Sequence, residues 1–95
     1  MEALHGGILC DMADAAMGIA FASTLDEAES FTTLELKINF LRPIREAHVI
    51  AIGRVVHRGR SIGLIECEVT DDKGRLVAKA SSTCFVLRGE ATKGR

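Results

Sequence analysis

The sequence predicts one α+β domain over residues 1–95, with a single helix packed on an antiparallel sheet, and three observations carry the prediction. The chain of 95 residues is long enough for one domain and too short for two. Residues 8–22 place apolar side chains at helical spacing, whereas apolar and polar residues alternate with a period of two from Phe31 onward. Turns separate four such alternating segments, and connections of hairpin length predict an antiparallel meander.

The predicted helix is apolar on nearly every side. One broad stripe follows the spacing of helical turns and consists of Ile8, Leu9, Met12, Ala13, Ala16, Ile19 and Ala20. At about 100° per residue, the other side groups Asp14 with Gly7, Cys10, Asp11, Met17, Gly18 and Phe21. Such a helix needs cover on more than one side, and a single sheet covers only one. We therefore expect the chain to associate as a homo-oligomer.

Four strands are expected after a polar loop at residues 24–30. In the first strand, at residues 31–40, Leu34, Leu36, Ile38 and Phe40 alternate with Thr33, Glu35, Lys37 and Asn39. This alternation places Thr33 and Asn39 on the polar side of the strand, and Arg42-Pro43 should end it. The other strands are expected at residues 48–57, 62–70 and 76–87, with turns at residues 58–61 and 71–74.

The composition excludes several classes of function. Twelve basic and thirteen acidic residues nearly balance, and Trp and Tyr are absent, so binding to nucleic acid or to anionic membranes is not expected. The longest apolar stretch contains Asp11 and Asp14 and is too short to span a bilayer. Three cysteines without a CxxC pair argue against a disulfide framework and favour a cytoplasmic location. We expect Cys10, Cys67 and Cys84 to be small core residues.

The start of the helix carries the first candidate site. Gly6 and Gly7 stand where unpaired backbone N–H groups point out of the helix end, and a ligand can approach glycine closely. Such N–H groups can stabilise the oxyanion that develops on an attacked carbonyl. Asp14 follows Gly7 by about two turns and shares its face, which suggests acyl-transfer chemistry. The alternative is a plain glycine loop, with Asp14 serving only to balance the helix dipole.

Neighbouring residues offer further interpretations of this segment. Asp11 could pair with Asp14 as acid and base, but it also fits a solvated position in the first helical turn. The spacing of His5, Asp11 and Asp14 matches no established zinc pattern. We therefore predict no metal site.

A short basic turn is the second candidate site. It consists of Arg58-Gly59-Arg60-Ser61 and follows His57. Arginine forks fit phosphate oxygens, while glycine and serine leave a backbone N–H and a hydroxyl free to donate. A solvated hairpin turn without a ligand is the alternative interpretation.

Together these motifs resemble the hotdog-fold thioesterases, and among them the phenylacetate-pathway (PaaI-like) acyl-CoA thioesterases. The resemblance runs from His5 to Leu87 and rests on the segments HGGILCDMADAAMGIA, TTLELKINFLRPI, VVHRGRS and LVAKASSTCFVL. It implies a long central helix wrapped by an antiparallel sheet, and a homodimer, often paired again as a tetramer, with active sites at the dimer interface. The implied reaction is hydrolysis of an acyl-CoA thioester, with CoA as part of the substrate and no further cofactor.

The resemblance also implies catalytic roles for individual residues. Asp14 corresponds to the catalytic carboxylate, which attacks the carbonyl or activates a water. Gly6 corresponds to the residue whose N–H polarises that carbonyl, with Gly7 beside it. His5 would hold this loop in shape or contact the substrate, and Thr33 of the neighbouring subunit would orient the water.

Substrate contacts follow from the same resemblance. Arg58, Arg60 and Ser61 lie where related proteins place groups for the CoA phosphates. Met17 and Phe21, together with residues of the partner, are expected to set the size of the acyl pocket.

The N-terminus departs from the family pattern. Members carry a helix, an edge strand and a loop with a polar residue, often Asn, before His-Gly-Gly, whereas only four residues precede His5 here. The expected sheet therefore lacks its N-terminal strand, whether in a fragment, a chain with a misassigned start or a shortened natural form. The alternatives to hydrolysis are a hotdog dehydratase or hydratase acting on acyl thioesters, and a truncated, non-catalytic acyl-CoA-binding domain.

Overall fold

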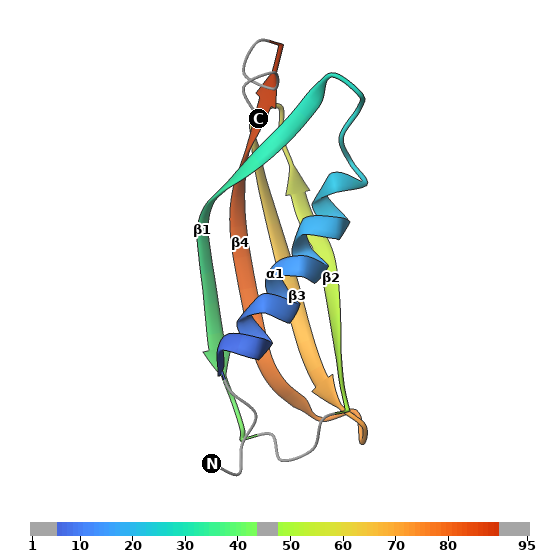
Figure 1. The fold of residues 1–95 in the computed structure, drawn as a ribbon, viewed down its shortest axis with the longest axis vertical. Helices are drawn as coiled ribbons and strands as arrows, with labels where there is room; N and C mark the ends of the chain where they lie inside the picture. The colour runs from blue at the N-terminus through green and yellow to red at the C-terminus, as the bar shows by residue number, and fades with distance from the viewer. Residues whose placement is uncertain (1–5, 44–47, 90–95) are drawn as a thin grey trace.

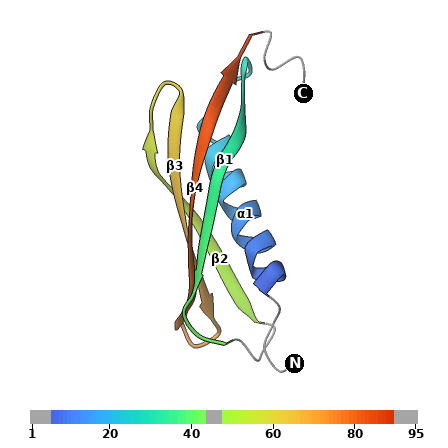
Figure 2. The ribbon, with the colours of Figure 1, turned by 90° about the vertical axis from the view of Figure 1, so that its left-hand side faces the viewer.

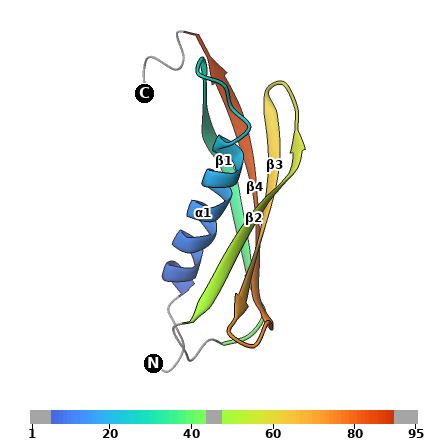
Figure 3. The same ribbon diagram turned by 90° about the vertical axis from the view of Figure 1, so that its right-hand side faces the viewer.

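The computed structural model describes residues 6–43 and 48–89, which form one helix and four strands (Figure 1). Helix α1 (Gly6–Ala22) is followed by β1 (Glu29–Phe40), β2 (Val49–Arg58), β3 (Ile62–Asp71) and β4 (Leu76–Arg88). The helix lies across one face of the sheet and leaves the other face bare (Figures 2 and 3). The predicted α+β class is confirmed, and each predicted element lies within two residues of its observed bounds.

The strands pair antiparallel in the order β1-β4-β3-β2. The predicted meander is correct for β2, β3 and β4 but wrong for β1, which pairs with β4 so that Glu29 lies opposite Arg88 and Phe40 opposite Ala78. The link between β1 and β2 accounts for the difference, because it contains Pro43 and is longer than the loop of a tight hairpin. β1 therefore adds to the free edge of β4, where its apolar side packs against the core.

The side of α1 that meets the sheet is a row of residues four apart. Its members are all buried: Leu9, Ala13, Met17 and Phe21. Ile8 and Ile19 of the predicted stripe are 45% and 74% exposed and lie on the apolar side of the helix that the sheet leaves uncovered. A helix that is apolar on nearly every side does not reveal in its sequence which side packs, and here the bulky Met17 and Phe21 fill the space over the sheet. Because both are buried in the core, their predicted place in the wall of an acyl pocket is wrong.

Two strand glycines let the helix approach the sheet closely. A Cβ at Gly53 of β2 would lie 2.5 Å from the carbonyl oxygen of Ala16. A Cβ at Gly63 of β3 would lie 2.1 Å from the ring of Phe21. A glycine inside a strand often marks such a close approach. These contacts fix α1 over β2 and β3 near its middle and near its C-terminal end.

The core lies between α1 and the inner strands β3 and β4. Its strand residues are Ile65, Cys67, Val69, Val77, Ala78, Ala80, Cys84 and Val86. Cys67 and Cys84 are core residues as predicted, whereas Cys10 on the helix is half-buried. Burial raises the pKa of the Cys67 thiol, which therefore stays protonated at neutral pH. Across the described residues, no helix combines the length and the hydropathy needed to cross a membrane.

A β-bulge between Thr33 and Glu35 interrupts β1, and the strand bends near its middle (Figure 1). The extra residue, Leu34, is 58% exposed. Thr33 lies opposite the buried Cys84, on the helix side of the sheet, while Asn39 lies opposite Lys79 on the other side. The prediction that Thr33 and Asn39 share one polar side is wrong, because the bulge shifts the alternation by one residue.

Candidate functional site

One flank of α1 carries two predicted site residues in a line that ends at Phe21. Gly7, Asp14 and Phe21 follow one another at intervals of seven residues, so each is rotated by only about 20° from the last and lies about 10 Å further along the axis. Gly7 and Asp14 are exposed. Asp14 has no hydrogen-bond or ion-pair partner among residues 6–43 and 48–89. Its carboxylate is thus open to a ligand on the flank that begins at the helix N-terminus.

The glycine pair forms the first two residues of α1. Backbone N–H groups in the first turn of a helix have no acceptor within the helix and carry the positive end of its dipole. The space beside Gly7 is open, whereas the ring of Phe40 packs against Gly6, 3.1 Å from where a Cβ would lie. The predicted oxyanion donors, the N–H groups of Gly6 and Gly7, therefore lie at the helix end beside the ring of Phe40. His5 lies outside the described residues, and its role stays a prediction.

The other helix-side candidates are not joined to Asp14. Thr33 lies exposed at the bulge of β1, and no hydrogen bond links it to Asp14. Asp11 is exposed one turn before Asp14. Within the described ranges there is no group of three or more His, Cys, Asp or Glu that could hold a metal ion. Thr33 is predicted to act from a neighbouring subunit, and that role stays a prediction.

The basic turn lies at the opposite end of the helix, between β2 and β3. Gly59 closes it by donating its N–H to the carbonyl of Ile62 at 2.8 Å. Only glycine fits here, because a Cβ would lie 2.9 Å from that same oxygen. The carbonyl of Ser61 accepts the N–H of Val86 at 2.7 Å, which ties the turn to β4.

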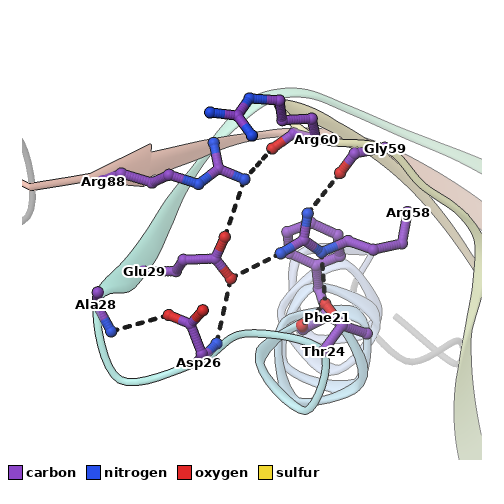
Figure 4. A network of polar contacts seen from close by, with 9 residues as sticks. All are labelled: Phe21, Thr24, Asp26, Ala28, Glu29, Arg58, Gly59, Arg60 and Arg88. Carbon is purple, nitrogen blue, oxygen red and sulfur yellow. Dashed lines mark hydrogen bonds and ion pairs between the residues drawn. The ribbon is translucent and has the colours of Figure 1, made fainter.

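Every nitrogen of the Arg58 guanidinium is held by the protein (Figure 4). Nε donates to Oγ1 of Thr24 at 3.0 Å, Nη1 to the carbonyl of Gly59, and Nη2 to Oε1 of Glu29 at 2.8 Å. The guanidinium carbon lies 5.6 Å from the centre of the Phe21 ring, within cation–π range. Arg58 thus links the end of α1, the start of β1 and the basic turn.

Glu29 is the centre of this network, with a side chain only 9% exposed. Its Oε1 accepts the N–H of Asp26 at 3.2 Å as well as Arg58, and its Oε2 accepts Arg88 at 2.9 Å. The Asp26 N–H lowers the pKa of Glu29 most; burial opposes this, and the arginines lower the pKa further, so it lies below its ordinary value. Arg88 in turn donates to the carbonyl of Arg60.

Arg60 is the exposed member of the turn. No dashed line reaches its guanidinium in Figure 4, and it has no partner in the part of the chain that the structure describes. The hydroxyl of Ser61 is likewise unpaired within that part. The structure therefore brings the predicted phosphate-binding residues into one turn, in which Arg58 is engaged by the protein while Arg60 and Ser61 can receive a ligand.

Glu29 and Arg88 are site candidates that sequence reasoning missed. Glu29 falls in the segment predicted to be a polar loop, and Arg88 follows the predicted fourth strand. Neither belongs to a motif. Only the pairing of β1 with β4, which sets the two residues opposite each other, could have indicated the ion pair.

A depression of about 240 Å³ lies elsewhere, over β2 and β3. It is lined by Ile52, Arg54, Glu66, Cys67 and Glu68, and an Arg54–Glu66 ion pair of 2.9 Å spans two of these residues. None of the predicted site residues lines it.

Comparison with known proteins adds independent information. The thioesterase superfamily matches residues 1–78. A candidate esterase of Saccharolobus solfataricus is 39% identical over 85 residues, which cover 90% of this chain and 60% of the relative. A protein of Bacillus halodurans solved with CoA is 33% identical, with a TM-score of 0.84 over 90% of this chain and 60% of that one. A candidate thioesterase of Ralstonia eutropha, described as phenylacetic acid degradation-related, is also 33% identical, with a TM-score of 0.83 over 88% and 63%.

The chain therefore belongs to the thioesterase superfamily, and the hotdog fold implied by the resemblance is confirmed. Its assignment to the phenylacetate-pathway group stays a prediction. The chain spans between 54% and 60% of the length of three curated relatives that it matches.

Proposed function

We propose that this protein hydrolyses an acyl-CoA thioester to a free acid and CoA. The observation that carries the proposal is the exposed, unpartnered carboxylate of Asp14 on a helix whose N-terminus presents the N–H groups of Gly6 and Gly7 and whose other end lies beside the basic turn. In an acyl-CoA the reacting carbonyl and the phosphates are also separated, by the pantetheine arm. Membership of the thioesterase superfamily and the CoA-bound relative support the proposal.

The proposed chemistry begins with attack on the thioester carbonyl carbon. Asp14 either takes a proton from an attacking water or attacks directly, forming a mixed anhydride that water then hydrolyses. Negative charge develops on the carbonyl oxygen in both routes, and N–H groups at a helix end stabilise it. The carbon–sulfur bond breaks, and CoA leaves as a thiolate that takes up a proton. CoA is the leaving group, and the reaction needs no further cofactor.

A second copy of the chain completes this site in the proposal. Gly7 and Asp14 lie about 10 Å apart along one helix, which is too far for both to reach the same carbonyl at about 3 Å. Two helices related by a two-fold axis perpendicular to them run antiparallel, and in this arrangement the glycine pair of one copy can lie beside Asp14 of the other. Ile8 and Ile19 on the outer side of α1 offer apolar surface for this contact.

The bare face of the sheet offers a second apolar surface. Its exposed large apolar residues are Ile50, Ile52, Ile62, Leu64 and Phe85. We place the pairing of two dimers into a tetramer on this face, because the face of α1 is already used by the dimer.

Release of free thiol from short-chain, medium-chain and aryl-CoA substrates tests the proposal. Asp14→Asn should lower kcat by about 10²–10⁴-fold, because it removes the base or nucleophile. Asp11→Asn is the matched control, since it removes an exposed carboxylate one turn away and should leave kcat close to the wild-type value. No thiol release by the wild type, or unchanged release by Asp14→Asn, would contradict the proposal.

The same assay separates the alternatives. Tight binding of CoA without turnover would favour a non-catalytic acyl-CoA-binding domain. Double-bond formation on a 3-hydroxyacyl thioester without thiol release would favour a dehydratase.

A further inference from the structure

The nearly buried carboxylate of Glu29 has no role in the proposed hydrolysis. Glu29 begins β1, whereas Phe40 ends β1 beside Gly6, so Glu29 is separated from the helix N-terminus by the length of a twelve-residue strand. At about 3.3 Å per residue, this places it well beyond reach of a carbonyl held there. Its contacts lead instead to the basic turn.

We propose that Glu29 is a positioning residue for recognition of the CoA phosphates, and that it acts through Arg58 and Arg88 on the turn at residues 58–61. The inference rests on the proposed function. It adds the residue that shapes the part of the site where the phosphates would bind.

Two arginines carry the effect of Glu29 to two consecutive carbonyls. Arg58 bridges Glu29 to the carbonyl of Gly59, and Arg88 bridges it to the carbonyl of Arg60. In a planar trans peptide the N–H lies on the side opposite the carbonyl. With both carbonyls drawn toward the network, the N–H groups of Arg60 and Ser61 are directed away from it. Neither N–H has a partner within residues 6–43 and 48–89.

The charged residues around the turn at residues 58–61 favour binding of an anion. Three guanidiniums, on Arg58, Arg60 and Arg88, stand near two carboxylates. The carboxylate of Asp26 accepts the N–H of Ala28 at 2.9 Å, and that of Glu29 serves two arginines at once. The guanidinium of Arg60 is left without a carboxylate in the described chain. Adjacent backbone N–H groups beside a guanidinium and a hydroxyl form a concave donor set suited to a phosphate.

The hydrogen bonds around Glu29 and Arg58 also hold the turn at residues 58–61 in one shape before a ligand binds. Arg58 is held by Thr24, Gly59 and Glu29, and the turn is closed by its own backbone bond. A ligand that meets a turn already in shape does not have to order it on binding, which raises affinity. Loss of Glu29 would free both arginines and release the two carbonyls.

Calorimetric titration of the full chain with CoA and with pantetheine, which lacks phosphates, tests the inference. Glu29→Gln should weaken binding of CoA by about tenfold, because charge-assisted hydrogen bonds are lost, and leave binding of pantetheine unchanged. Asp71→Asn is the matched control. Asp71 forms a 2.7 Å ion pair with Arg75 and accepts N–H groups in the turn after β3, so the variant perturbs a similar turn at the other end of that strand.

A double-mutant cycle shows whether Glu29 acts through the turn. Arg60→Ala should weaken CoA binding, and adding Glu29→Gln should weaken it little further, because the residue being positioned is already gone. Arg88→Ala, which leaves Glu29 and Arg58 in place, should also weaken CoA binding and keeps the test available if Glu29→Gln folds poorly. Additive losses in the cycle would overturn the inference.

Binding and turnover distinguish this inference from the proposed function. If hydrolysis is absent but Glu29→Gln still weakens CoA and spares pantetheine, the inference stands and the proposed reaction fails. If hydrolysis is present but Glu29→Gln binds CoA like the wild type, the inference fails and the reaction stands. Equal affinity of the wild-type protein for CoA and pantetheine would also overturn the inference. In active protein, KM for acyl-CoA should rise while kcat stays near the wild-type value.

Discussion

Asp14 and Glu29 are both carboxylates, but their surroundings suit opposite uses. Asp14 is exposed on a helix flank without a hydrogen-bond partner in the described chain, which leaves its oxygens open to a substrate or a water. Glu29 receives the N–H of Asp26 and the guanidiniums of Arg58 and Arg88, so both of its oxygens are occupied. At this scale the partners of a carboxylate, and not its residue type, decide whether it can take part in a reaction.

We expect stability to fall in acid partly because of Glu29. Its pKa in the folded protein lies below its ordinary value, so its contribution is complete above the ordinary pKa of about 4.3 and is lost as pH falls through the lowered value. Unfolding midpoints measured between pH 7 and pH 3 should therefore fall less steeply for Glu29→Gln than for the wild type. Parallel curves for the two proteins would contradict this expectation.

The turn after β3 supplies a second test of the same principle. The N–H of Arg75 and, with it, the Arg75 guanidinium and the Lys73 N–H lower the pKa of Asp71 against the opposing effect of burial. Like Glu29→Gln, Asp71→Asn should make the unfolding midpoint fall less steeply between pH 7 and pH 3 than it does for the wild type. The two effects should add, because the residues lie in separate networks.

At the scale of elements, the contact between α1 and β2 depends on the absence of a side chain at Gly53. Gly53→Ala should destabilise the fold by about 1–3 kcal/mol, because its Cβ would meet the Ala16 carbonyl and force the helix outward. Gly18→Ala is the matched control on the helix. Its Cβ would meet only the Phe31 ring at 4.0 Å, so the change should stabilise the helix by about 0.5–1 kcal/mol. Denaturant unfolding measures both, and equal effects would rule out close packing as the cause.

The sequence predicted the elements well because their signals are local. Helical spacing before Phe21 and alternation after Phe31 decide each element without reference to the others. The side of α1 that packs could not be predicted, since apolar residues surround the helix and Ile19 looks as suitable for burial as Met17. The bulge at Leu34 was also hidden, because an exposed leucine in an alternating strand looks like a core residue.

The residues of the candidate site also differ in whether the sequence alone could indicate them. Gly6, Gly7, Asp14 and the basic turn stand in short motifs, and the structure places all of them on the flank or at the ends of α1. Glu29 and Arg88 lie far apart in the sequence, and only the β1–β4 pairing brings them together. Motifs therefore indicated the candidate groups themselves, whereas the residues that contact and hold those groups required the fold.

At the scale of the whole molecule, two apolar surfaces lead us to expect stepwise association. Ile19→Lys, on the outer side of α1, should shift sedimentation toward the monomer and abolish thiol release, because the proposed site needs two copies. Ile52→Lys, on the bare face of the sheet, is the matched variant at a similarly exposed position and should stop association at the dimer without loss of activity. A monomeric, fully active Ile19→Lys protein would contradict this arrangement.

The β1–β4 pairing also fixes the order in which the molecule can assemble. β2, β3 and β4 are neighbours in sequence and can pair through short turns, whereas β1 can pair only after β4, the last of these four strands in the sequence, has been made. The contacts of Glu29 with Arg58 and Arg88 form only when β1 docks, so the proposed phosphate-binding turn is the last part of the fold to take its final shape. By the same logic it is the first part to open when the edge of the sheet frays. If CoA binds this turn as proposed, it should hold β1 against β4, and saturation with CoA should make the protein harder to unfold.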